Sequence, residues 1–479
     1  MLHYPGEQEG ETPMTIIADE WLRRRFEGLR AASRQDPYPS EAERRRHLAA
    51  VEKALVSRKD AIVAAVDADF GGRLRHETLF AEVYVTAEAF RHSRRHLGGW
   101  MKRRRRAVPL TLMPGSAWVQ PQPLGVVGII SPWNYPLMLA LSPLAGALAA
   151  GNRVLIKPSE LTPHTSALIA DLLSEALPED RVAVVTGGAE LGAEFAALPF
   201  DHLLFTGSTR VGRMVMQAAA RNLTPVTLEL GGKSPALLLP DTDIAEAAAD
   251  IAYGKFTNAG QTCVAPDYIL APRTAVPGLV EALRAAVARH FQAADGSWAM
   301  SAVFGEAGRR RQSSLLAEAR SRGCAIETLG PDFAGLDFGP AVVFDPPSDL
   351  ALMEEEIFGP ILPVVPYDTP EQALNYIRER PRPLALYLFG RERAAIDRAL
   401  RDTVAGGTVI NDTLIHVAVE ELPFGGVGPS GIGRYHGREG FDTFSHLKAV
   451  FDRRGPRLDR LIRPPLNALH ERLARFLIG

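Results

Sequence analysis

Cysteine is scarce in this chain: only Cys263 and Cys324 occur among 479 residues. Two thiols are too few for a disulfide framework or for a zinc site of the usual thiolate kind, so we expect no disulfide scaffold and no bound metal. Residues 1–14 are polar and acidic, without the apolar core of a secretory signal peptide. These absences together predict a cytoplasmic protein.

An excess of charge of either sign is also missing. The chain has 54 Lys and Arg residues against 56 Asp and Glu, a formal net charge of −2, which gives no general attraction to nucleic acid or to anionic lipid. The basic run KRRRR at 102–106 follows an amphipathic stretch over 84–101, and we interpret it as the solvated end of a helix. We expect no nucleic-acid partner.

No long apolar run is free of proline. The most hydrophobic stretch, 124–151, is interrupted by Pro132, Pro136 and Pro143, which would leave unmet hydrogen bonds in a membrane. This pattern predicts a strand, a polar turn and then a buried helix. The segment 467–479 predicts a short charged amphipathic helix, a docking segment rather than a membrane anchor.

Alternating helical and strand-like segments make up most of the chain. Residues 16–100 have apolar positions at helical spacing, and from about 117 short β-rich runs alternate with helical ones. The predicted strands lie near 154–157, 182–188, 202–208 and 226–232, with helices over 163–176, where Thr162 is the expected N-cap, and 209–220. Such alternation predicts an α/β fold with a doubly wound parallel sheet, which binds ligands at the carboxyl ends of its strands.

Three residues could carry covalent chemistry, although each has a more common structural interpretation. Cys263, in NAGQTC, lies among small polar residues that favour an accessible thiol, whereas most single cysteines are buried filler. Glu229 lies within an apolar strand, which raises a carboxyl pKa and suits a general base, or it is a structural carboxylate. Asn134, in PWNYP, could donate to an oxyanion or could simply occupy a turn.

Two further motifs favour a phosphate-bearing ligand only weakly. FTGSTRVGR (205–213) places glycines at a helix start, where free N–H groups can bind an anion or where Thr206 or Ser208 can cap the helix. KPSE (157–160) places an acidic residue at a strand end, where it could accept hydrogen bonds from a ribose.

Taken together, the motifs resemble those of the aldehyde dehydrogenase superfamily. The order PWNYP, KPSE, FTGSTRVG, LELGGKSP, NAGQTC, EEIFGP and LPFGGVGPSG runs through residues 30–455, and Cys263 follows Glu229 by 34 positions (263 − 229), the family's spacing of nucleophile and base. GRYHGREGFDTFSH (433–446) resembles the class 3 branch. Within it, NLTPVTLELGGKSPAL and NAGQTCVAPDYIL are most similar to bacterial coniferyl aldehyde dehydrogenases.

The resemblance implies the NAD(P)-dependent oxidation of an aldehyde to its carboxylic acid. Cys263 would form a thiohemiacetal and then a thioester, with its oxyanion held by Asn134 and the Cys263 N–H group, and Glu229 would activate the hydrolytic water. NAD is the expected cofactor, with NADP possible, because Glu160 would repel a 2′-phosphate. The implied cofactor-binding residues are Pro132, Trp133, Lys157, Ser159, Glu160, Gly207, Ser208, Leu230, Gly231, Glu356 and Phe358. The implied substrate residues are Tyr135, Thr262 and Phe424.

The resemblance also implies the domain plan and the partners. It gives a Rossmann-type cofactor domain (1–116 and 126–231), an α/β catalytic domain (232–430), small bridging strands (117–125 and 440–455) and a tail (456–479). The bridging strands imply a homodimer, and the substrate would be a small aromatic aldehyde of the coniferyl or cinnamyl type. Medium- or long-chain aliphatic aldehydes are the enzymatic alternative, and a catalytically silent relative is the non-enzymatic one.

Overall fold

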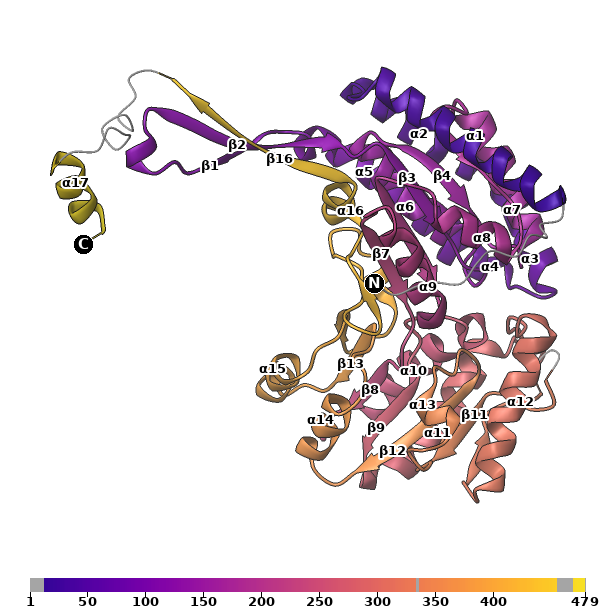
Figure 1. Cartoon of the computed structure of the whole chain (residues 1–479). Helices are drawn as coiled ribbons and strands as arrows, with labels where there is room; N and C mark the ends of the chain where they lie inside the picture. Colours follow the sequence, from indigo (N-terminus) through magenta and orange to yellow (C-terminus); the bar gives the residue numbers. More distant parts are fainter. Residues whose placement is uncertain (1–12, 333–335, 455–467, 479) are drawn as a thin grey trace, which may run out of the picture.

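The computed structural model describes residues 13–332, 336–454 and 468–478, which form two α/β bodies and a thin arm (Figure 1). One body contains a six-stranded sheet and the other a seven-stranded sheet, while a three-stranded sheet forms the arm. The predicted α/β class is confirmed.

The chain opens with helices, as the spacing of its apolar residues predicts. In α2, for example, Leu48, Val51 and Leu55 are buried along one face. The elements are α1 (Pro13–Gln35), α2 (Glu41–Ser57), α3 (Lys59–Phe70), α4 (Arg75–Glu77), the π-helical η1 (Thr78–Tyr84) and α5 (Val85–Trp100).

The six-stranded sheet has the order β15-β7-β6-β3-β4-β5, and all strands but β15 are parallel. Its strands are β3 (Val126–Ile130), β4 (Arg153–Lys157), β5 (Val182–Val184), β6 (His202–Gly207), β7 (Val226–Leu230) and β15 (Gly431–Ile432). The helices between them are α6 (Met138–Ala150), α7 (Pro163–Ala176), α8 (Ala189–Ala196) and α9 (Thr209–Ala220). The predicted strands and the helices over 163–176 and 209–220 are all present.

The apolar run at 124–151 folds as its prolines predict. It becomes β3, a turn and α6, every residue of which is buried. Within the part of the chain that the structure describes, no helix is both long and apolar enough to cross a membrane.

The predicted cap of α7 is wrong in its detail. Thr162 precedes the helix, but its side chain accepts no hydrogen bond from the first turn and instead donates to the Ser159 carbonyl. Asp69 of α3 accepts the N–H groups of His164 and Thr165 at 3.0 and 2.8 Å. A distant carboxylate thus replaces the local cap, which sequence spacing cannot reveal.

The seven-stranded sheet has the order β10-β11-β12-β9-β8-β13-β14 and is parallel except for the β10–β11 pair. Its strands are β8 (Pro235–Leu238), β9 (Tyr268–Pro272), β10 (Ile326–Thr328), β11 (Ala341–Phe344), β12 (Ile361–Tyr367), β13 (Ala385–Phe389) and β14 (Gly407–Ile410). The accompanying helices are α10 (Ile244–Phe256), η3 (Thr257–Gly260), η4 (Arg273–Ala275), α11 (Val276–Phe291), α12 (Gly305–Ser321), α13 (Ala351–Glu354), α14 (Pro370–Arg378), α15 (Arg393–Asp402) and η5 (Ile415–Ala418). Helix α16 (Gly437–Thr443) packs instead against α5 and α6.

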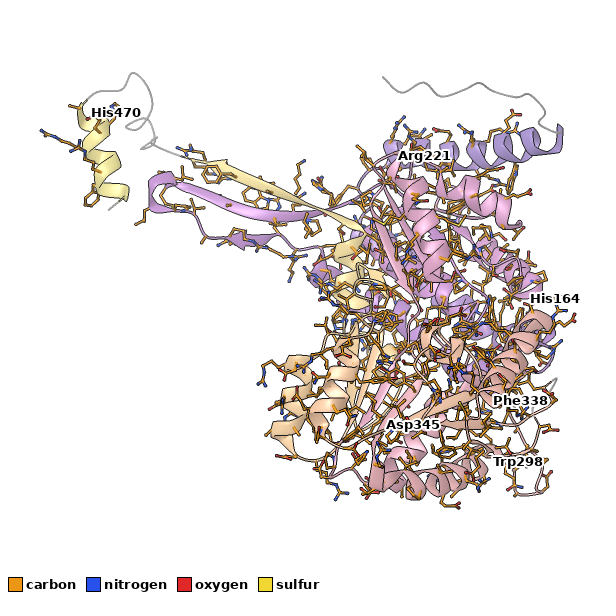
Figure 2. The ribbon with its side chains drawn as sticks, turned by 60° about the horizontal axis from the view of Figure 1, so that its bottom comes forward. His164, Arg221, Trp298, Phe338, Asp345 and His470 are labelled. Carbon is orange, nitrogen blue, oxygen red and sulfur yellow. The ribbon has the colours of Figure 1, made fainter. Side chains whose placement is uncertain are left out.

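The arm is an antiparallel sheet of β1 (Arg104–Arg106), β2 (Gly115–Pro123) and β16 (Ser445–Arg453), with the short η2 (Leu110–Leu112) between β1 and β2. The interpretation of KRRRR as a helix end is therefore wrong in part: α5 ends at Trp100, and the last three arginines pair with β2. The arm extends away from both bodies, and α17 (Ala468–Ile478), which carries His470, lies beyond its tip (Figure 2).

The predicted domain limits stay a prediction. Residues 1–12, 333–335, 455–467 and 479, which belong to the predicted cofactor domain, catalytic domain, bridging strand and tail, lie outside the described residues.

Candidate active site

Two cavities, each of about 300 Å³, meet at Cys263 and Glu229. One lies at the carboxyl ends of β3, β6 and β7, and we call it the strand-end cavity. The other, which we call the apolar cavity, lies between η1, α6 and residues 413–424. The two proposed reactive residues can therefore be reached from two separate sides.

The turn that positions Cys263 has an unusual backbone. Asn258, Ala259 and Gly260 have φ angles of 51°, 53° and 77°, in the left-handed region that costs an ordinary residue about 1 kcal/mol or more. A Cβ at Gly260 would also overlap the Gly359 carbonyl. Such a conformation persists only where neighbouring groups hold it.

A buried polar network holds this turn. The Arg73 guanidinium donates to the Asn258 side-chain oxygen at 2.6 Å and to the Asn134 carbonyl at 3.1 Å, and Glu77 accepts the Asn258 N–H at 3.1 Å. The Asn258 amide in turn donates to the carbonyls of Asn134 and Gln261. The network therefore fixes the segments that carry Asn134 and Cys263 relative to each other.

The surroundings of Cys263 disfavour its thiolate form. Burial, followed by the charges of Glu356 and Glu229, raises the pKa of the Cys263 thiol to about 12. The backbone N–H groups of Cys263 and Val264 partly offset this effect because they stabilise the thiolate.

The Asn134 side chain is fixed in the wall of the strand-end cavity. It is buried, and its amide donates to the Gln261 carbonyl at 3.0 Å. A primary amide has two N–H donors, so the second can serve a group in the strand-end cavity, which Asn134 lines together with Cys263.

Glu229 is a buried carboxyl without a hydrogen-bond partner. Glu229 lies on β7, where it pairs with Thr206 of β6 on one side and with Gly431 of β15 on the other. The residue is only 3% exposed. Neither carboxyl oxygen has a partner within the described chain. Burial raises the pKa of Glu229 well above its usual value, so the carboxyl group becomes a strong proton acceptor once it is ionised.

Aromatic and aliphatic side chains cover most of the apolar cavity. Tyr135, Thr262 and Phe424 all line it, and the Tyr135 hydroxyl lies 2.8 Å from the Thr262 hydroxyl. Sequence reasoning did not find the other apolar wall residues, Phe80, Ala81, Tyr84, Val85, Met138, Leu139, Val264, Leu414, Ile415, Val417, Ala418 and Tyr435. Glu229 is the only acidic or basic side chain in the described wall.

The strand-end cavity brings together most of the expected cofactor residues. Those in its wall are Pro132, Trp133, Gly207, Ser208, Leu230, Gly231, Glu356 and Phe358. Ser208 also caps α9 by accepting the Val211 N–H at 3.4 Å, so the capping interpretation is confirmed, while the binding of a ligand by this turn stays a prediction.

Glu356 fits a hydroxyl-bearing ligand. Its Oε1 atom is buried without a hydrogen-bond partner, and burial, followed by the nearby Asp267, raises the pKa of Glu356 to about 8. A Cβ at Gly231 would overlap its carboxyl group. An unused acceptor beside a glycine cradle suits the ribose hydroxyls of a dinucleotide.

Lys157, Ser159 and Glu160 line neither cavity. Lys157 ends β4 and the other two residues follow it. Because β4 lies beside β3 in the sheet, all three share its carboxyl edge with Pro132 and Trp133. Lys157 Nζ donates to Glu160 Oε2 at 2.9 Å.

Sequence reasoning missed the contribution of α12 to the strand-end cavity. Arg311 lines it and donates to the carbonyls of Glu356 and Ile357 at 2.8 and 2.7 Å, and Gln312 also donates to the Ile357 carbonyl. Val303, Gly308 and Gln261 complete the wall. No motif marks Arg311, because it lies in the ordinary helical sequence GRRRQ.

Comparison with known proteins identifies the family. The model of the aldehyde dehydrogenase family matches residues 30–450. The chain belongs to the aldehyde dehydrogenase family. It is therefore an aldehyde dehydrogenase that acts on small aldehydes.

Similar proteins cover nearly the whole chain. The enzyme is 48% identical to the "Probable coniferyl aldehyde dehydrogenase" of Pseudomonas aeruginosa, over 92% of both chains. It is 41% identical to the 4,4'-diaponeurosporen-aldehyde dehydrogenase of Staphylococcus aureus, over 85% of this chain and 88% of that one.

Solved structures agree with this assignment. The substrate-bound state of Staphylococcus aureus AldH has a TM-score of 0.90 at 37% identity, covering 96% of this chain and 99% of that one. A Mycobacterium tuberculosis aldehyde dehydrogenase complexed with NAD+ has a TM-score of 0.81 at 32% identity, covering 91% and 90%.

Proposed function

We propose that this enzyme oxidises an aromatic aldehyde of the coniferyl or cinnamyl type to its acid, with NAD as the hydride acceptor. The observation that carries the proposal is the position of Cys263 and Glu229 where two cavities meet. The apolar cavity, with Tyr135 and Phe424 in its wall, suits a flat neutral ring, and the coniferyl aldehyde dehydrogenases among the relatives support the same substrate class.

Formation of an acyl-enzyme on Cys263 is the first half of the proposed reaction. The thiol gives its proton to water, and the sulfur then adds to the aldehyde carbon, which forms a C–S bond and moves the carbonyl π electrons onto oxygen. The Asn134 amide and the Cys263 backbone N–H group stabilise this oxyanion in the thiohemiacetal.

The cofactor fits the strand-end cavity. Bound NAD would supply the hydride acceptor that converts the thiohemiacetal to a thioester. Glu356 and Phe358 would hold the nicotinamide ribose, Gly207 and Ser208 the pyrophosphate, and Lys157, Ser159 and Glu160 the adenosine ribose, with Pro132, Trp133, Leu230 and Gly231 in the surrounding wall.

Hydrolysis of the thioester is the second half. Glu229 accepts a proton from water as the water oxygen attacks the acyl carbon, and the C–S bond breaks to return the Cys263 sulfur and release the acid. The lack of other partners for the Glu229 oxygens leaves both available to orient that water.

A panel of aldehydes with NAD tests the substrate class. We expect kcat/KM for coniferyl and cinnamyl aldehydes to exceed that for straight-chain aldehydes by about tenfold or more, because a rigid ring fills the apolar cavity with little loss of entropy. A higher kcat/KM for octanal or dodecanal would favour the aliphatic alternative, which the apolar wall also permits. No turnover of any aldehyde would support a catalytically silent relative.

Cofactor preference depends on Glu160. We expect NAD to be preferred over NADP, because the 2′-phosphate would meet this carboxylate, and Glu160→Gln should raise the NADP-to-NAD ratio of kcat/KM by about tenfold. Glu281→Gln, at an exposed position on α11, is the matched control and should leave the ratio unchanged. An unchanged ratio in Glu160→Gln would remove this residue from the cofactor site.

The arm supports the proposal of a homodimer. β16 is the edge strand of the sheet, and Leu447 and Phe451 on it are 40% and 44% exposed. An open edge with exposed apolar side chains is a surface that a second subunit can cover. Light scattering of the purified chain measures its mass in solution.

A further inference from the structure

Two histidines and a glutamate from distant parts of the chain converge beside the wall of the apolar cavity. His92 and His96 are one turn apart on α5, and Glu421 lies in the turn between η5 and Phe424. Their ligand atoms all lie within 4.8 Å of one another. We propose that His92, His96 and Glu421 form a binding site for a divalent transition metal such as zinc.

The distances suit a small cation after minor side-chain movement. His92 Nε2 and His96 Nε2 lie 3.3 and 3.9 Å from Glu421 Oε1. Ligand atoms around a tetrahedral zinc ion lie about 3.4 Å apart, given metal–ligand bonds of about 2.1 Å. Two imidazoles and one carboxylate leave a fourth position for water, and this donor set is typical of zinc and its neighbours rather than of calcium or magnesium.

The hydrogen bond of His96 leaves its Nε2 atom for a ligand. His96 Nδ1 lies 3.0 Å from the His92 carbonyl oxygen, which can only accept, so Nδ1 donates a proton to it. Nε2, which lies 3.9 Å from Glu421 Oε1, is therefore the ring atom that a metal ion would use. A backbone carbonyl that accepts from the other ring nitrogen is the usual partner of a metal-bound histidine.

His92 supplies a second, independent observation. Its side chain is 8% exposed, and Nε2 is buried without a hydrogen bond even though Glu421 Oε1 is 3.3 Å away. A buried nitrogen that lies near a carboxylate but makes no hydrogen bond is an unusual feature that a bound cation would explain.

Charged groups of both signs surround the cluster. Glu88 on α5 adds negative potential at His92, whereas Arg95 opposes it and Arg91 pairs with Glu88. The rings of His92 and His96 also pack near Trp100, at 5.7 and 5.9 Å between centroids. This packing accounts for the position of the rings but not for their convergence with Glu421.

A metal here would connect two walls of the apolar cavity. α5 begins at Val85, which lines the cavity, and the segment from Thr413 to Phe424 supplies much of the opposite wall. The bound ion would fix Glu421, and with it this segment, to α5. The proposal revises the expectation from the sequence that the chain holds no metal, which rested on its lack of cysteines.

Calorimetric titration of the chelator-treated full-length protein with zinc tests the proposal. We expect one saturable equivalent, with the Kd raised at least about tenfold by Glu421→Gln or His96→Gln. Both variants change exposed or half-exposed side chains, so they should fold, whereas a change at buried His92 could disturb the packing on Trp100. Glu281→Gln and His164→Gln, the latter at a surface position labelled in Figure 2, are the matched controls and should bind zinc as the unmodified protein does.

Two further measurements separate this site from the thiol. Zinc binding should persist in Cys263→Ala, and zinc should slow amide hydrogen exchange over residues 413–424 in the unmodified protein but not in Glu421→Gln. The proposal is overturned if zinc does not bind saturably. It is equally overturned if binding disappears in Cys263→Ala but persists in His96→Gln and Glu421→Gln.

Discussion

Cys263→Ala should lower kcat by at least about 10⁴-fold, the scale seen when an enzyme loses its nucleophile. The alanine cannot form the C–S bond, and no other thiol lines either cavity within the described residues. The cavity walls remain, so the binding of NAD and of the aldehyde should persist. Formation of reduced nicotinamide, followed by absorbance, measures the loss.

Cys324→Ala is the matched control for the thiol. Cys324 is partly buried, packs against the core of the seven-stranded body and lies outside both cavities. We expect its kcat to remain within about twofold of the unmodified enzyme, as for other changes away from the chemistry. If Cys263→Ala retained normal turnover, the covalent mechanism would be wrong.

Glu229→Gln should lower kcat by about 10²- to 10⁴-fold, the usual contribution of a general base. The amide matches the carboxyl group in shape and resembles its protonated form, so the fold should be kept. Attack by Cys263 and hydride removal can still occur once, but the thioester then persists. Rapid mixing should show a burst of reduced nicotinamide close to one equivalent, and the intact mass should increase by that of the acyl group.

The pH profile gives a second measure of the same residue. Burial raises the pKa of Glu229 and of the Cys263 thiol. The reactive ionised form of each group therefore becomes abundant only at higher pH than for the same group in water. Turnover of the unmodified enzyme should therefore increase toward alkaline pH. In Glu229→Gln, the rate of thioester hydrolysis should no longer show the increase with pH that comes from ionisation of the carboxyl group. If the variant instead kept the pH profile of the unmodified enzyme and showed no burst, Glu229 would not be the base.

The sequence predicted the local elements of the fold well. β4, α7 and α9 match their predicted ranges closely, because their strand and helix patterns depend on neighbours along the chain. β1 was missed because three successive arginines have no strand pattern, and their pairing with β2 depends on a hairpin. The Asp69 cap of α7 was missed for a similar reason, since the two partners are about 95 residues apart.

The sequence predicted those residues of the candidate site that lie within recognisable motifs, but not the others. Cys263, Glu229 and Asn134 were found because their motifs resemble those of a family. The Arg73 network was missed because it joins residues 185 positions apart, and Arg311 because nothing in its helix distinguishes it from a solvated face. For the same reason, the i,i+4 spacing of His92 and His96 could be read along the chain, but the approach of Glu421 could not.

The nearly uncharged wall of the apolar cavity also has a consequence for the release of the acid product. An aldehyde is neutral and is stable among aromatic and aliphatic side chains, whereas the acid made from it ionises in water. A carboxylate in that cavity would find no cationic side chain in the described wall and would face the Glu229 carboxyl group. Under the proposed function, we therefore expect the cavity to bind the reactant more tightly than the product, so that the oxidation favours product release.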